Sequence, residues 1–235
     1  MDYPSRSLIK NAIFAGAVVV AFGGLSTTAH AVTMGGTFGV SIYQGSGNNN
    51  INDANNQAQQ GNPLIAPGSL LESATFTGAL NFSASGSNST IGDFFSSSSG
   101  SSNTFGSTTL NTTISTSNFG LTSIFVFTGF TSNVLTGIIT HDDGMSLYDG
   151  VGYTNTVASA PFPVVATPTA YTGLTGPWEL IYAEANGLPA VLNFDITRSD
   201  APPTVPLPAA LPLFAGGAGV LGFFARRRKR KNSTA

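Results

Sequence analysis

The chain has 235 residues, of which 9% are charged, and a formal net charge of −2 at pH 7. It has no cysteine, which excludes disulfide bonds, thiolate nucleophiles, Cys-ligated zinc and iron–sulfur clusters. Between residues 32 and 204, ten acidic residues stand against one basic residue, Arg198, so this region carries a net charge of −9. That acidity argues against a nucleic-acid partner, because Lys and Arg contact the phosphates, and it permits cation binding.

The first 31 residues have the organisation of a signal peptide. Arg6 and Lys10 precede an apolar stretch, residues 12–25, and the small residues Ala29 and Ala31 form an Ala-x-Ala cleavage site. We predict an N-terminal signal helix that is cleaved after Ala31; the alternative is an uncleaved N-terminal anchor.

Residues 32–199 are predicted to form an all-β ectodomain, an antiparallel β-sandwich or jelly-roll-like fold. Gly, Ser, Thr and Asn dominate, and short apolar or β-branched runs alternate with turn-forming residues. The predicted strands are 36–43, 74–83, 105–115, 122–129, 134–140, 145–149, 176–184 and 190–197.

Two polar segments interrupt these strands. Residues 48–62 are predicted to be a loop with a helical turn around residues 54–60. Residues 83–102 are rich in Ser and Gly, a composition that permits disorder, but Ile91, Phe94 and Phe95 could pin the segment to a core.

The last two strands are predicted to form a hairpin. Asn186-Gly187 lies between them and suits a turn that needs positive φ. Large apolar residues occupy alternate positions on both strands, which predicts one buried face. The residues of that face are Trp178, Leu180, Tyr182, Leu192, Phe194 and Ile196.

Residues 140–150 read Thr-His-Asp-Asp-Gly-Met-Ser-Leu-Tyr-Asp-Gly and have the residue types of a chemical site. Neighbours in a regular strand point to opposite faces, so Asp142 and Asp143 can face one ligand only where the backbone is irregular. Calcium prefers several oxygen ligands and tolerates irregular loops. The alternative is a solvated turn in which Asp caps backbone amides.

Together with residues 176–184 and 187–192, this stretch resembles the protective-antigen-like β-sandwich family, which includes yeast flocculins and many bacterial surface lectins. The shared pattern is a strand ending in Asp-Asp-Gly, a strand with an Asp-Gly turn, and a later strand with Tyr-x-Glu before a Gly-rich turn. The match covers residues 124–197. Tyr148-Asp149-Gly150 is one residue shorter than the family pattern, and the flocculin specificity loops are not recognisable.

In carbohydrate-binding members the Asp pair, often joined by a cis peptide, holds a calcium ion that binds sugar hydroxyls. The resemblance therefore implies a calcium ion held by Asp142 and Asp143, with Glu184 as a third ligand. Asn186 and His141 are further ligand-binding candidates. For His141 the alternative is a hydrogen-bonded loop histidine.

An enzyme would need other features. Glycoside hydrolysis uses paired carboxylates, and Glu179 and Glu184 would face opposite sides of one predicted strand. The sequence has no Gly-x-Ser-x-Gly or zinc motif. We expect a non-enzymatic module, either a calcium-dependent carbohydrate-binding protein or a structural surface or matrix protein with no discrete ligand; a secreted hydrolase is the third hypothesis.

After a short linker, residues 200–204, the segment 205–231 has three parts. The motif Val205-Pro206-Leu207-Pro208-Ala209 comes first, residues 207–225 are uncharged, and residues 226–231 are six basic residues. An apolar run of this length approaches the roughly 20 residues that cross a bilayer, and the basic residues should stay cytoplasmic. We predict a C-terminal transmembrane helix; the alternative is a buried helix followed by a solvated basic end.

This tail resembles the PEP-CTERM class of sorting signals in its Val-Pro-Leu-Pro-Ala variant (VPLPA-CTERM), and all five motif positions match. In that class an exosortase, a membrane-embedded cysteine transpeptidase, recognises the tail and cleavage near the motif is expected. The resemblance implies a protein exported to the cell envelope or extracellular surface of a Gram-negative bacterium. It would be membrane-anchored before processing and linked to extracellular polysaccharide.

Overall fold

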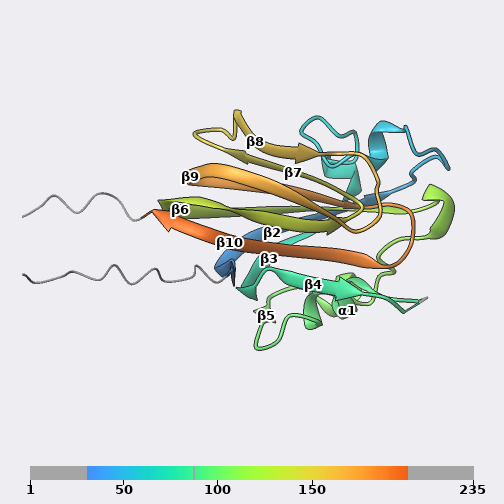
Figure 1. Cartoon of the computed structure of the whole chain (residues 1–235). Coiled ribbons are helices and arrows are strands. Elements are labelled where there is room, and N and C mark those ends of the chain that lie inside the picture. Colours follow the sequence, from blue (N-terminus) through green and yellow to red (C-terminus); the bar gives the residue numbers. More distant parts are fainter. Residues whose placement is uncertain (1–30, 87, 201–235) are drawn as a thin grey trace, which may run out of the picture.

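A long two-stranded ribbon organises the protein in the computed structural model, which describes residues 31–86 and 88–200. Strand β6 (Thr122–Asp142) and strand β9 (Thr167–Glu184) pair antiparallel along nearly their whole lengths. The first half of β6 also pairs with β2 (Gly35–Gly45), and its second half pairs with β10 (Ala190–Asp200). Every strand pairing among the described residues is antiparallel, so the prediction of an all-β antiparallel fold is confirmed (Figure 1).

The hydrogen-bonded path through the sheet is β5-β3-β2-β6-β9-β7-β8, and β10 also pairs with β1 and β4. The remaining strands are β1 (Val32–Thr33), β3 (Leu70–Ala79), β4 (Asn81–Ala84), β5 (Ser102–Asn103), β7 (Gly144–Asp149) and β8 (Asn155–Ala160). The helical elements are short: α1 (Ile91–Ser96), α2 (Ser107–Leu110) and the 3-10 turns η1 (Ala54–Asn56), η2 (Pro67–Ser69) and η3 (Ser117–Phe119).

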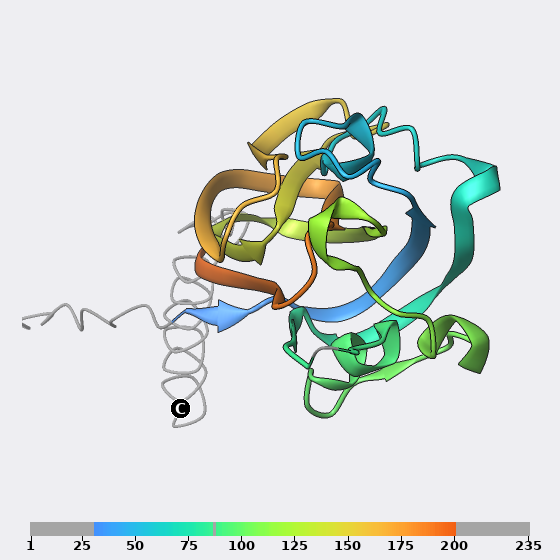
Figure 2. The ribbon, with the colours of Figure 1, turned by 90° about the vertical axis from the view of Figure 1, so that its right-hand side faces the viewer.

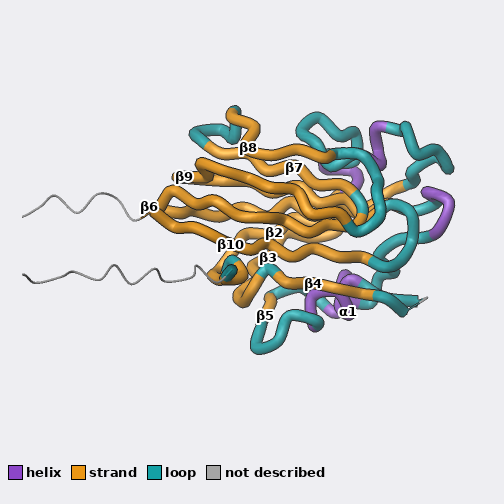
Figure 3. The backbone as a smooth tube through the Cα atoms, in the orientation of Figure 1, coloured by secondary structure: helices purple, strands orange, loops and turns teal. Residues whose placement is uncertain are grey.

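The β6–β9 ribbon folds back on itself near its middle. The pairing register shifts between residues 131 and 136, and on the opposite strand Gly173 and Gly176 have φ values of +83° and +70° that favour glycine. Ala183 pairs with both Ile124 and Gly144, so the start of β6 and the residues after its end flank the same point of β9. All four ends of the ribbon therefore lie at one end of the molecule, where Figure 3 shows many of the loops gathered.

The folded ribbon gives two layers that share one core. Rings from opposite layers meet there: the centroids of Phe82 and Phe127 are 5.8 Å apart, and those of Trp178 and Phe194 are 5.7 Å apart. Figure 2, viewed along the strands, shows the ribbons curling around this interior. The arrangement is sandwich-like, and the jelly-roll description stays a prediction.

The predicted hairpin between the last two strands is wrong. Strand β9 pairs with β6 and β7, whereas β10 pairs with β6, β4 and β1, so the loop 185–189 crosses from one layer to the other. The predicted inward face is confirmed, because five of its six residues are buried and Ile196 packs against them. Alternation identifies which side chains face the core, but it does not identify which strand completes the backbone hydrogen bonds.

Most other predicted strands lie within observed ones, with three corrections. Residues 122–129 and 134–140 belong to the single strand β6, and residues 74–83 divide between β3 and β4. The predicted strand 105–115 is wrong, because residues 107–110 form the helix α2. There the Gly106 amide donates to the Glu72 carboxylate (3.0 Å) and Leu110 packs on the core, contacts that override the β propensity of threonine.

The Ser-rich segment is anchored as its apolar residues suggested. Helix α1 begins with a capping box, in which Thr90 and Asp93 each bind the other's backbone amide. Ile91, Phe94 and Phe95 are fully buried in the shared core. Their burial, each about 1.5–3 kcal/mol, fixes the segment despite its composition.

The loop between β2 and η2, residues 46–66, contains the predicted polar segment 48–62 and covers the outer face of the sheet. Its Ala58 and Leu64 pack with residues such as Ile124 and Ile181 in a second, smaller cluster. The predicted helical turn is η1, and the buried Asn56 donates to the carbonyls of Gly47 (2.9 Å) and Asn50 (2.7 Å). The Thr122 hydroxyl at the start of β6 donates to the Asn56 side-chain oxygen, and this bond holds the loop near the end of the ribbon.

The predicted signal segment up to residue 30 and most of the predicted linker and tail (residues 201–235) lie outside the described residues. Within residues 31–86 and 88–200, no helix is long and apolar enough to cross a membrane.

Candidate functional site

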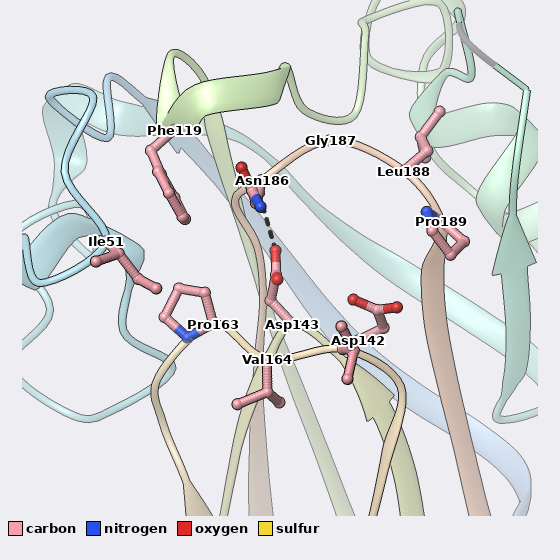
Figure 4. A pocket seen from close by; sticks show the side chains of 11 residues that line it. Ile51, Phe119, Asp142, Asp143, Pro163, Val164, Asn186, Gly187, Leu188 and Pro189 are labelled. Atoms are coloured by element: carbon pink, nitrogen blue, oxygen red, sulfur yellow. Dashed lines mark hydrogen bonds between the residues drawn. The ribbon is translucent and has the colours of Figure 1, made fainter.

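A cavity of about 320 Å³ lies where the ribbon ends meet. Its walls come from the β6–β7 junction, the loop 185–189, residues 163–165, and the residues Ile51 and Phe119 (Figure 4). Asp142 and Asp143 are the only charged residues of the lining, and Asn186 is its only other polar side chain. Most of the remaining wall is apolar, a composition typical of small-ligand sites.

The Asp pair stands at the end of β6. Asp142 is the last residue of that strand, Asp143 precedes β7, and the peptide bond between them is cis. A cis peptide bond at this pair is what the resemblance to the protective-antigen-like family implies. The backbone is therefore irregular here, and both residues line one cavity instead of opposite faces of a strand.

Asp143 is 5% exposed, and its Oδ2 accepts the backbone amides of Ala185 (2.7 Å) and Asn186 (2.9 Å). Burial raises the pKa of Asp143 to about 6, against those two hydrogen bonds and with help from the charge of Asp142. Burial also raises the pKa of Asp142. Arg198 is the only Lys or Arg in the described ranges, and it pairs with Asp200 (Nε to Oδ1, 2.8 Å), so neither carboxylate has a Lys or Arg side chain beside it.

Glu184 lies behind the pair and outside the cavity lining. It is fully buried; its Oε1 accepts the Ser115 hydroxyl (2.9 Å), and its Oε2 is 3.0 Å from the Tyr182 hydroxyl. That same hydroxyl donates to the carbonyl oxygen of Asp142. Burial, reinforced by the charge of Asp143, raises the pKa of Glu184 well above its usual range.

The raised pKa of Glu184 favours a protonated carboxyl, which accounts for the hydrogen bonds around it. The Tyr182 hydroxyl has one hydrogen and two oxygen neighbours, so it cannot donate to both. A protonated Glu184 donates to the Tyr182 oxygen and leaves the Tyr182 hydrogen for the Asp142 carbonyl. Glu184 thereby positions the Asp142 backbone through Tyr182.

His141 is fully buried and does not line the cavity. Its Nδ1 lies 2.6 Å from the carbonyl oxygen of Asp143, and its Nε2 lies 2.7 Å from the Thr169 hydroxyl. A carbonyl only accepts, so Nδ1 donates and Nε2 accepts from Thr169. Burial lowers the pKa of His141, which keeps the ring neutral. The histidine holds the Asp143 backbone. This fits the alternative interpretation of His141, a hydrogen-bonded loop histidine.

The polar side chains that line the cavity offer only oxygen ligands to a hard cation. Within residues 31–86 and 88–200, no three Asp, Glu or His side chains are grouped to hold a metal ion. A calcium ion would be held by the carboxylates of Asp142 and Asp143, with the Asn186 amide oxygen and backbone carbonyls of the lining as neutral donors. Calcium accepts such mixed oxygen sets, so the residues fit this ion without Glu184.

Sequence reasoning missed most of the cavity wall. Ile51, Phe119 and residues 163–165 are far from the Asp pair in sequence and carry no motif. One signal could have indicated these residues: Val164 and Val165 are apolar but belong to no predicted strand. In the structure they are 36% and 82% exposed. Such exposed apolar groups often mark a binding surface.

Gly144, at the start of β7, allows the backbone at Pro161 to pack closely against it. A Cβ at this position would lie 2.3 Å from the backbone oxygen of Pro161. We expect Gly144→Ala to lower the free energy of unfolding by at least about 1–3 kcal/mol, measured by urea unfolding, because backbone must move. Gly68→Ala is the control, since a Cβ at Gly68 meets nothing within 4 Å. Equal stability of both variants would contradict the tight approach.

Glu184→Gln tests the role of the buried acid. The neutral glutamine has nearly the same shape and keeps the Tyr182–Asp142 hydrogen bond, so we expect the free energy of unfolding at pH 7.5 to change by less than about 1 kcal/mol. If calcium binds Asp142 and Asp143, its affinity, measured by titration calorimetry, should change less than threefold. A drop of tenfold or more would make Glu184 a direct ligand.

Comparisons with known proteins show similarity of structure alone. No protein-family model matches the sequence, and no curated protein matches it. One similar solved structure is a PA14 sugar-binding domain from an RTX adhesin, 20% identical, with a TM-score of 0.45, covering 72% of this chain and 98% of that one. Another is the PA14 domain of the MpAFP antifreeze protein, 17% identical, with a TM-score of 0.44, covering 76% of this chain and 98% of that one.

Proposed function

We propose that the protein is an exported surface module that binds carbohydrate through a calcium ion held by Asp142 and Asp143. One observation carries this proposal: two partly or fully buried carboxylates face a cavity whose other side chains, apart from Asn186, are apolar, with no cationic side chain beside them. Buried charges are normally paired or coordinate a metal. A divalent cation would neutralise the pair.

Different residues of the chain would hold the calcium ion, position the carboxylates and contact the sugar. A bound calcium ion supplies coordination for sugar hydroxyls, since it takes 6–8 oxygen ligands and the protein side chains fill only some positions. Asp143 is oriented by the amides of Ala185 and Asn186, and the Asp142 backbone is held by Tyr182. The apolar residues of the wall would offer contact to the C–H groups of a sugar.

The proposal includes the route of the protein to the surface. Signal cleavage after Ala31, recognition of residues 205–209 by an exosortase-type enzyme and a membrane span through residues 207–225 are supported by sequence alone. They would place residues 32–199 at the envelope or extracellular surface of a Gram-negative bacterium, with extracellular polysaccharide as the partner.

A non-enzymatic role is part of the proposal. The Glu179 carboxylate accepts a hydrogen bond from Gln60 at the outer face (3.1 Å), whereas Glu184 is buried on the inner side. The two acids therefore do not flank one substrate. The second candidate, a structural matrix protein with no discrete ligand, is favoured by the absence of three grouped acidic or histidine side chains in the described ranges.

A glycan array separates these two functions. The full-length protein, purified in a detergent without a sugar headgroup, is applied with calcium and then washed with EDTA. Binding to at least one glycan that EDTA reverses, and that the double variant Asp142→Asn, Asp143→Asn lacks, is the expected result. Binding that persists in EDTA, or no binding to any glycan, would favour the structural role.

A further inference from the structure

The turn that carries Phe119 has a backbone that its residues do not favour. The Gly120 amide donates to the Ser117 carbonyl (3.4 Å), and the two residues between them, Asn118 and Phe119, have φ values of 59° and 57°. Asparagine tolerates this left-handed region, but a bulky residue such as phenylalanine rarely adopts it. Glycine is the residue that such a position favours.

Neighbouring loops hold the turn in place. The Phe119 carbonyl accepts the backbone amide of Asn49 (3.2 Å). On the other side the loop 185–189 approaches so closely that a Cβ at Gly187 would lie 3.2 Å from the Ser117 nitrogen. The turn is therefore wedged between two segments that also line the cavity.

The Phe119 ring does not belong to either hydrophobic cluster of the described residues. It is half-buried, and its side chain points into the cavity that Asp143 and Pro163 also line (Figure 4). A disfavoured backbone and an aromatic ring outside the core make no evident contribution to folding. Such outliers cluster at ligand clamps, where the surrounding structure enforces them.

We infer that Phe119 is a specificity-determining residue that packs against the apolar face of a neutral pyranose sugar. This inference rests on the proposed function. The hydroxyls of such a sugar would face Asp142 and Asp143, and its C–H face would lie on the Phe119 ring. The two Asp carboxylates would neutralise the calcium ion and the lining has no Lys or Arg, so no net positive charge is left to pair with a sugar carboxylate or sulfate, and an uncharged sugar fits the site best.

The test compares Phe119→Gly with Phe119→Tyr in the full-length protein, using titration calorimetry with methyl glycosides of neutral pyranoses and of the corresponding uronic acids. Phe119→Gly should bind the preferred neutral glycoside about tenfold more weakly, from the loss of buried apolar contact. Its melting temperature without sugar should not fall, because glycine suits the backbone, and its calcium affinity should be unchanged. Phe119→Tyr keeps the flat ring and should bind as the wild type does.

The outcomes separate this inference from the proposal beneath it. Wild-type affinity in Phe119→Gly would overturn the role of Phe119 and leave the proposed function intact, as would loss of sugar affinity in a stably folded Phe119→Tyr. If Phe119→Gly melts lower, the ring is structural and the inference fails. Equal affinity for uronic acids would overturn the neutral class. No sugar binding by the wild type would overturn the proposed function itself.

Discussion

Replacing Asp142 and Asp143 together by asparagine is expected to abolish the rise in melting temperature that calcium causes. At a calcium concentration 100 times the dissociation constant, binding stabilises the folded state by about 2.7 kcal/mol. In a domain of this size that corresponds to roughly 5–10 °C. The transition can be followed by the fluorescence of Trp178, the only tryptophan, which is fully buried.

The controls for this prediction isolate the metal. Asparagine at position 143 still accepts the amides of Ala185 and Asn186, so in EDTA the double variant should melt no lower than the wild type. Asp149→Asn is the matched control, because Asp149 is similarly buried (7% exposed) and lies outside the cavity lining. An undiminished calcium response in the double variant would place the ion elsewhere.

The second large effect concerns pH. Without calcium, the pKa of Asp143 in the folded protein lies at about 6, above its ordinary value of 3.8. The folded state therefore binds this proton more tightly than the unfolded state, and stability should fall as pH rises between these two values. The loss amounts to about 3 kcal/mol over the whole window, and about half of it remains to be lost at pH 5. The raised pKa of Glu184 acts in the same direction, and the lowered pKa of buried His141 acts in the opposite direction.

Calcium should reverse this dependence, because a cation requires ionised carboxylates. Urea unfolding at pH 5 and pH 7.5 checks both signs. Relative to the double Asp142→Asn, Asp143→Asn variant, which shares His141 and Glu184, the wild type in EDTA should lose about 1–2 kcal/mol more stability between pH 5 and pH 7.5. In saturating calcium the wild type should instead gain stability relative to the variant as pH rises. The same pH dependence with and without calcium would contradict a cation on this pair.

Local patterns in the sequence predicted the faces of the strands better than their partners. The spacing of Trp178, Leu180 and Tyr182 identified a buried face because side chains alternate along any strand. The pairing of that strand depends on the folded β6–β9 ribbon, whose bend arises from residues 36–45 positions apart. A two-residue Asn-Gly signal between strands therefore predicted a hairpin where the chain instead crosses between layers.

The candidate site shows the same division. Asp142 and Asp143 could be predicted as site residues because the two carboxylates are adjacent in the sequence. Glu184 was placed beside them in sequence reasoning, but its burial against Ser115 and Tyr182 removes it from the cavity. Phe119 has no local signal of function, since only the meeting of the ribbon ends brings it to the carboxylates.

Equilibrium dialysis with calcium tests the central claim most directly. The full-length protein at pH 7.5 is predicted to bind one calcium ion per chain that the double variant Asp142→Asn, Asp143→Asn does not bind, while Glu184→Gln and Asp149→Asn retain it. Equal calcium binding by the wild type and the double variant, or none by either, would contradict a cation held by Asp142 and Asp143.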